Sequence, residues 1–167
     1  VTTTYSVSGT NSLGCVSAAV VTVMVDGNLP NVSIFASSNS VCEGNPVTLS
    51  GNGANSYTWT GGVNNGIPFV PASTSSYTLS GTNSCGSGTA LVSVSVNPNP
   101  SLSVSPASVT LCPGNSTTLT ASGANSYTWT GGIINGTAFV PLFSNTYSVT
   151  GSNAFGCTGT STAAVTV

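Results

Sequence analysis

The sequence contains no lysine, no arginine and no histidine, and its only acidic residues are Asp26 and Glu43. Charged residues make up 1% of the chain, whereas typical soluble proteins carry about 25%. Because proteins bind nucleic acids by neutralising phosphates with Lys and Arg, this composition excludes a nucleic-acid-binding function. It also excludes electrostatic attachment to an anionic membrane surface, which needs the same two residues.

Catalysis is equally hard to build from this composition. General acid–base chemistry uses histidine or carboxylates, and the many Ser and Thr hydroxyls have no basic side chain to activate them. Transition-metal sites need clusters of His, thiolate or carboxylate ligands. We therefore expect no catalytic, cofactor-binding or metal-binding residues, and we predict that the chain is not an enzyme. Its longest apolar run, 18–25, falls short of the roughly 20 residues that span a bilayer, so we expect no membrane insertion.

What the sequence does contain is a repeat. The segment Gly-Ala-Asn-Ser-Tyr-Thr-Trp-Thr-Gly-Gly occurs at 53–62 and again, letter for letter, at 123–132. A fixed period indicates an array of similar modules. The segment from Tyr77 onward recurs from Tyr5 and from Tyr147. The predicted domains are the C-terminal part of an incomplete module at 1–25, a module at 26–97 and a module at 98–167.

Within each module, apolar and polar residues alternate with a period of two. Tyr57 and Trp59 flank Thr58, and three valines alternate with serines at 92–96. Clusters of Gly and Asn separate these short runs, as at 61–66. Short alternating strands with turn signals between them predict an all-β fold of tandem immunoglobulin-like β-sandwich modules.

The recurring aromatic residues are interpreted as core residues, because each lies in an alternating strand. They are Tyr57, Trp59, Tyr77, Tyr127, Trp129 and Tyr147. Tyr77 and Tyr147 open the penultimate strands, where a tyrosine hydroxyl commonly bonds back to the backbone at a sandwich corner.

Four of the five cysteines predict structural disulfides. Cys42 and Cys85 fall in one module and Cys112 and Cys157 in the next, so we expect one intradomain disulfide per module. Free buried thiols are the alternative; a metal site lacks the usual Cys-x-x-Cys spacing. Cys15 matches Cys85 and Cys157 in position and is expected to be unpaired within this sequence. Persistent disulfides indicate an extracellular location.

The motifs Cys42-Glu-Gly, Tyr57-Thr-Trp and Tyr77-Thr-Leu-Ser-Gly-Thr-Asn, with the closing Val-Ser-Val-Ser-Val-Asn-Pro, give the chain a family resemblance. It resembles the immunoglobulin-like, PKD-related repeats of very large secreted surface proteins of gliding Bacteroidota-type bacteria. The resemblance covers the whole chain and implies a place in a cell-surface adhesin or a secreted filament. The acidic motif that usually follows the Trp in PKD domains is replaced here by Thr60-Gly-Gly.

Two functional hypotheses follow. The first is a structural repeat of an extracellular filament or adhesin stalk, a stiff and protease-resistant spacer that associates with neighbouring modules or laterally packed copies. The alternative is a carbohydrate- or surface-binding module that uses the loops after Trp59 and Trp129 to contact surface glycans. Those loops, 61–66 and 131–136, differ in sequence between the two modules.

Overall fold

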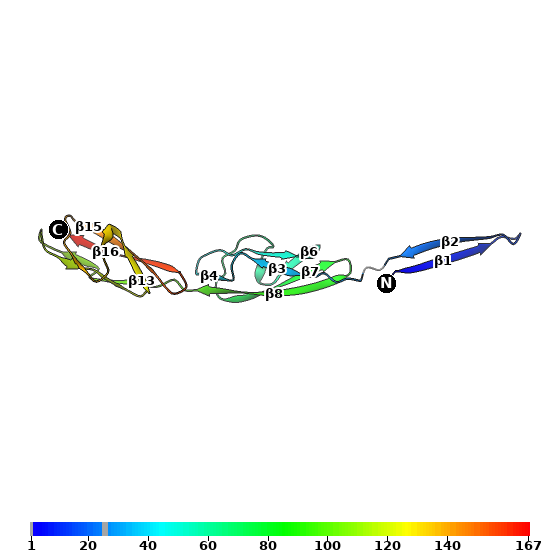
Figure 1. The fold of residues 1–167 in the computed structure, drawn as a ribbon, viewed down its shortest axis with the longest axis horizontal. Coiled ribbons are helices and arrows are strands. Elements are labelled where there is room, and N and C mark those ends of the chain that lie inside the picture. The colour runs from blue at the N-terminus through cyan, green and yellow to red at the C-terminus, as the bar shows by residue number, and fades with distance from the viewer. Residues whose placement is uncertain (1, 25–26) are drawn as a thin grey trace. The chain divides into compact units, whose positions relative to one another are not determined.

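The computed structural model describes residues 2–24 and 27–167 of the protein. Asp26 and the predicted boundary between residues 25 and 26 lie outside the described residues. Within those residues, regular structure consists of β-strands and two 3-10 turns, η1 (Thr60–Gly62) and η2 (Thr130–Gly132) (Figure 1). The all-β prediction is therefore confirmed. No helix in the described part is long and apolar enough to cross a membrane.

The strands form one hairpin and two similar sets. The hairpin lies in the incomplete module at 1–25, and the two sets lie in the modules at 26–97 and 98–167, called here the second and the third repeat. The hairpin consists of β1 (Thr3–Thr10) and β2 (Val16–Val23). The second repeat contains β3 (Ser33–Ala36), β4 (Ser40–Cys42), β5 (Leu49–Asn52), β6 (Ser56–Trp59), β7 (Ser75–Asn83) and β8 (Gly86–Asn97). The third repeat contains β9 (Ser103–Ser105), β10 (Ser108–Thr110), β11 (Thr117–Thr118), β12 (Thr120–Ser122), β13 (Ser126–Trp129), β14 (Ala138–Phe139), β15 (Asn145–Ser152) and β16 (Thr158–Thr166).

The two repeats share one sheet topology. The strand order β4-β8-β7-β6 in the second repeat corresponds to β10-β16-β15-β13 in the third, and β3-β5 corresponds to β9-β12. The short first strand of each four-stranded sheet runs parallel to the last strand of its repeat, with Cys42 opposite Asn97 and Thr110 opposite Thr166. The chain therefore contains tandem immunoglobulin-like sandwiches, as predicted.

Contacts divide the chain into two compact units that do not follow the repeats. Unit 1 comprises 1–37, 48–69 and 76–93, and unit 2 comprises 38–47, 70–75 and 94–167. Unit 2 therefore contains the whole third repeat together with β4 of the second repeat.

The core of the third repeat lies in unit 2 and is formed by the inward-facing residues of its strands. The buried cluster is Leu119, Ala121, Trp129, Tyr147, Val149, Ala163 and Val165. In unit 1, Leu49, Trp59, Tyr77 and Leu79 are buried at the matching positions. Alternating residues bury because successive side chains of a strand point to opposite faces of its sheet. Burial of these side chains supplies the main stabilising term of each sandwich.

The hairpin β1–β2 is fully paired but has no buried residue. Tyr5 is 59% exposed and Val7 is 68% exposed, whereas the matching Tyr77 and Leu79 are 7% and 0% exposed. Thus the hairpin repeats the last two strands of a module, while its apolar face has no second sheet packed against it among the described residues.

Candidate functional site

The loop after Trp129 is held to the core by Asn135. The indole Nε1 of Trp129 donates a hydrogen bond to Asn135 Oδ1 (3.1 Å), and the same oxygen accepts from Ala121 N (2.7 Å). Asn135 Nδ2 donates to Ala121 O (3.2 Å). This side chain therefore connects the tryptophan, the loop and β12, and it is not available for a ligand.

The same arrangement recurs in the second repeat. Trp59 Nε1 donates to Asn65 Oδ1 (3.1 Å), which also accepts from Gly51 N (2.6 Å). The sequence offered a signal for this role, because the two loops differ at 63–64 and 133–134 but both keep Asn-Gly, at 65–66 and 135–136. Asn65 belongs to the loop that the alternative hypothesis assigns to glycan contact, but its Oδ1 is occupied by the bonds to Trp59 and Gly51.

The tyrosine hydroxyl bonds fall on different tyrosines from those expected. Tyr127 OH donates to Ala124 O and accepts from Ala124 N (both 2.8 Å), and Tyr57 makes the matching pair with Ala54 (both 2.9 Å). The rings of Tyr77 and Tyr147 instead pack edge-on against Phe69 and Phe139. Their ring centroids lie 5.3 and 5.2 Å apart.

The six aromatic residues that were predicted to lie in the core are buried to different extents. Trp59, Trp129, Tyr77 and Tyr147 are buried, at 6% to 9% exposure, whereas Tyr57 and Tyr127 are half-buried. The half-buried pair are the two whose hydroxyls cap the turns at 53–56 and 123–126, and this explains why they stay near the surface.

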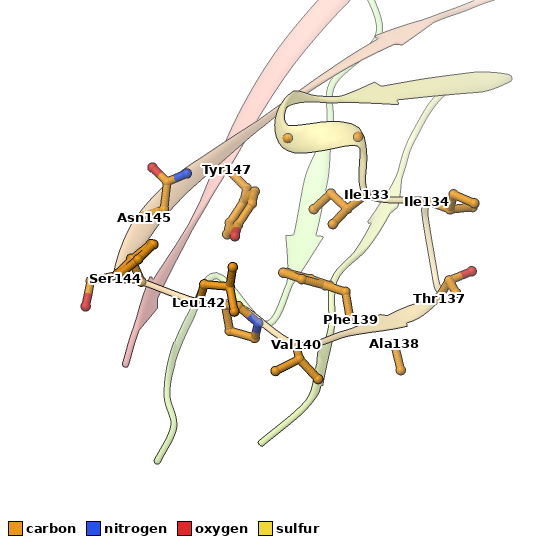
Figure 2. A pocket seen from close by; sticks show the side chains of 14 residues that line it. Ile133, Ile134, Thr137, Ala138, Phe139, Val140, Leu142, Ser144, Asn145 and Tyr147 are labelled. Carbon is orange, nitrogen blue, oxygen red and sulfur yellow. The ribbon is translucent and has the colours of Figure 1, made fainter. Parts of the chain in front are cut away.

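A hollow of about 720 Å³ lies beside the loop after Trp129, within unit 2 (Figure 2). Its wall is the segment from Gly131 through Phe139 to Tyr147, and Figure 2 shows Tyr147, Leu142 and Phe139 grouped around it. Leu142 and Phe143 are 77% and 79% exposed. The hollow therefore presents apolar side chains to solvent, with Ser144 and Asn145 at one edge.

Three of these apolar residues have no apolar counterpart of similar size in the second repeat. At the positions that match Ile134, Leu142 and Phe143, the second repeat has Asn64, Ala72 and Ser73. A surface that differs so strongly between copies is not a conserved feature of the repeat architecture.

The second candidate site is a covalent connection between successive repeats. Cys42, at the end of β4, is disulfide-bonded to Cys157, in the turn before β16, with Cα atoms 5.5 Å apart. Both residues belong to unit 2. The bond joins the second repeat to the third, so the expectation of one intradomain disulfide per module is wrong.

The strand order explains why the intradomain pairing fails. Cys112 follows β10, which lies beside the C-terminal end of β16, whereas Cys157 immediately precedes the first residue of β16. A nine-residue strand spans about 30 Å at about 3.3 Å per residue, and a disulfide needs Cα atoms within about 7 Å. In the second repeat, Cys42 pairs with the last residue of β8 and Cys85 precedes its first, so the same geometry separates them.

Backbone and amide contacts surround the disulfide. Glu43 N donates to Asn97 O (2.9 Å), and Asn99 Nδ2 donates to Glu43 O (3.1 Å). Asn153 Nδ2 donates to Pro98 O (2.8 Å), and Cys157 Sγ lies 3.9 Å from Asn97 O. The connector 97–100 is thus fixed to the end of β4 and to the turn that carries Cys157.

A glycine makes room for this connector. A Cβ atom at Gly159 would collide with the backbone carbonyl of Pro100. At the matching position of the second repeat, a Cβ at Gly88 would collide with the carbonyl of Pro30. The approach of the connector to the last strand is therefore a repeated feature that depends on a missing side chain.

Both candidate sites contain almost no charged groups. Glu43 is the only acidic residue that the structure describes, and the sequence has no basic side chain to pair with it. Among the described residues, no group of three His, Cys, Asp or Glu side chains is placed to hold a metal ion. The chemistry that these sites offer is disulfide formation and apolar contact.

No protein-family model matches the sequence, and the search of curated proteins found no match. Among solved structures, the chain is similar to a titin structure, Titin-A168169, at 14% identity and a TM-score of 0.31, over 83% of this chain and 91% of that one. The immunoglobulin-like assignment rests on the strand pairing and core described above.

Proposed function

We propose that the protein is a structural repeat of an extracellular filament or cell-surface adhesin stalk, in which disulfides join each repeat to the next. The observation that carries this proposal is the Cys42–Cys157 bond. A bond inside one module would stabilise that module alone. A bond between modules keeps the array covalently connected when the connector between them is cut, which is useful to a spacer under load.

The extracellular location is part of the proposal. Disulfides persist in oxidising compartments and are rare in the cytosol. The absence of Lys and Arg leaves trypsin-type proteases without a cleavage site, which suits a protein exposed to proteolysis. This is the setting implied by the resemblance to the repeats of bacterial surface proteins.

The proposed partners are other copies of the repeat. With a formal net charge of −2 for 167 residues, electrostatic self-repulsion is small. The exposed Leu142 and Phe143 supply an apolar surface for lateral packing. Nucleic acid, membrane insertion, a cofactor and an enzymatic activity have no part in this function.

The proposal is tested by locating and imaging the native protein. Antibodies raised against this chain should label the surface of intact, unpermeabilised cells of the source organism, and the labelled material should appear as threads by negative-stain electron microscopy. Labelling confined to permeabilised cells, or purification of the native protein as compact globular particles, would contradict it.

The second candidate function is surface or glycan binding at the hollow beside the loop after Trp129. The exposed apolar side chains there favour it, since ligand sites combine apolar walls with a few polar groups. Glycan-array binding that is lost in Phe143→Ser and Leu142→Ser, but kept when the matching Ser73 and Ala72 of the second repeat are changed, would favour this function over the spacer.

A further inference from the structure

The sequence contains three Asn-Gly pairs, at 52–53, 65–66 and 135–136. Asn-Gly is the sequence in which an asparagine most easily loses its side-chain amide, because glycine has no side chain to shield the backbone nitrogen that attacks the amide carbon. The reaction needs this nitrogen and the amide to approach each other, and a fold that binds them to other groups prevents it. The surroundings of each pair therefore decide which of the three can react.

In the pairs at 65–66 and 135–136, both reacting groups are bound to other atoms. The glycine N–H donates to the carbonyl of a buried leucine, Leu49 in one repeat and Leu119 in the other, at 2.9 Å in both. The amide oxygen of each asparagine accepts from the indole N–H of a tryptophan and from a backbone N–H. Attack of the glycine nitrogen on the amide would require these bonds to break first, which is a local opening of the loop.

The pair at 52–53 has the opposite arrangement. Gly53 N donates its hydrogen bond to Asn52 Oδ1 (2.8 Å), so the side-chain carbonyl is folded back over the nitrogen that has to attack it. Both residues are exposed, at the end of β5 and the start of the turn 53–56, and are therefore open to water. The third repeat has Ser122 at the position that matches Asn52, so it has no amide there.

We propose that Asn52 is a site of spontaneous deamidation in the folded protein, with water as the co-reactant. Gly53 N loses its proton to solvent and forms a bond to Asn52 Cγ, while the bond from Cγ to Nδ2 breaks and that nitrogen leaves as ammonia. The product is a cyclic imide. Water then opens the imide at one of its two carbonyls and gives aspartate or isoaspartate. One water is consumed and one ammonia is released, and nothing is oxidised or reduced.

The two products change the second repeat in different ways. Each adds a carboxylate to a chain that has a formal net charge of −2 and no basic side chain. The aspartate leaves the backbone as it is. The isoaspartate places an extra methylene in the backbone at the residue that pairs with Ser33, next to the turn that Tyr57 caps through Ala54. The inference goes beyond the proposed function and does not depend on it.

The test is incubation of the purified chain at mildly alkaline pH, followed by peptide mapping. Mass spectrometry detects the replacement of an amide NH₂ by OH, and chromatography separates the aspartate and isoaspartate peptides. In the folded chain, Asn52 should react on the order of tenfold faster than Asn65 and Asn135, because those two need their loops to open first. In the reduced chain unfolded in guanidinium chloride, all three should react at similar rates, since each is followed by glycine.

Two controls accompany this measurement. Asn52→Ser introduces the residue of the third repeat, so it should abolish the reaction and keep the fold, which circular dichroism checks. Asn145 has the same close approach, with Thr146 N donating to its Oδ1 (2.9 Å), but the threonine side chain shields the nitrogen, so Asn145 should stay intact. The proposal would be overturned if Asn52 stays intact in the folded chain, or if Asn65 or Asn135 reacts there as fast as Asn52.

Discussion

Cys42 and Cys157 are bonded although 115 residues separate them in sequence, and each belongs to a different repeat. The bond therefore closes a loop that contains most of the second repeat and most of the third. In the chain-entropy account, cross-linking a loop of that size removes unfolded-state entropy worth about 4–5 kcal/mol. Stability that would be local to one module is shared between two.

The first prediction concerns this shared stability. The double variant Cys42→Ala/Cys157→Ala should lower the unfolding free energy of the linked repeats by about 4 kcal/mol, which corresponds to a fall of about 10 °C in Tm for a chain of this size. Calorimetry with and without dithiothreitol measures it. The reductant should lower the Tm of the unmodified chain and leave that of the double variant unchanged. If dithiothreitol does not change the Tm of the unmodified chain, the disulfide does not stabilise the two repeats together.

Much of this fold could be predicted from the sequence, because the determining signals are local. The alternation around Trp59 and Trp129 predicts strands, and the repeat predicts that two modules share one topology. The disulfide partner of Cys42 could not be predicted in this way. It depends on the parallel pairing of β4 with the far end of β8, a non-local contact between residues 40–42 and 95–97. Cysteine spacing alone does not reveal which end of the last strand each cysteine lies beside.

The candidate sites, too, could be predicted from the sequence only in part. The structural role of Asn135 left a sequence signal, since Asn-Gly is kept in both loops. The hollow left none, because the exposure of Leu142 and Phe143 depends on how the segment 137–147 folds over the loop after Trp129. The sequence alone does not tell whether adjacent apolar residues such as Leu142 and Phe143 lie in the core or on the surface.

The second prediction concerns Asn135. Replacing it with alanine removes its hydrogen bonds to Trp129 Nε1 and to the backbone of Ala121. The indole N–H and the backbone groups of Ala121 are then left without these hydrogen bonds in a partly buried site. We therefore expect the unfolding free energy to fall by about 1–3 kcal/mol. Asn115→Ala, the same chemical change at an exposed asparagine, is the control and should change stability little. Equal effects of the two substitutions in urea denaturation would show that Asn135 has no special role.

The third prediction compares two glycines at one position of the repeat. A Cβ at Gly151 would lie 2.8 Å from Ala124 Cβ and 2.8 Å from Leu102 Cδ2, whereas a Cβ at Gly9 of the exposed hairpin would meet nothing within 4 Å. Gly151→Ala should therefore destabilise the third repeat by about 1–3 kcal/mol through overpacking, while Gly9→Ala should be neutral. Thermal unfolding of both variants decides this. A neutral Gly151→Ala would mean that the sheets separate more easily than the structure indicates.

The fourth prediction concerns lateral association. Because the chain has no basic residue and only two acidic ones, any self-association of the chain should not depend on screened charges. Sedimentation velocity in low and in molar NaCl, with reductant present, should give the same distribution of species. Phe143→Ser should shift that distribution toward monomer, since Phe143 is an exposed apolar side chain at the hollow. Dissociation of the assemblies by salt would contradict this account of how copies pack.

The central claim is that disulfides join successive repeats, and disulfide mapping of the non-reduced protein tests it most directly. Proteolysis after aromatic residues such as Tyr57, Tyr77 and Phe155 separates Cys42, Cys85 and Cys157 into different peptides. Mass spectrometry should then detect the Cys42 peptide linked to the Cys157 peptide, and reduction should release both. A Cys42 peptide linked to the Cys85 peptide would place the disulfide inside one module and would contradict the claim.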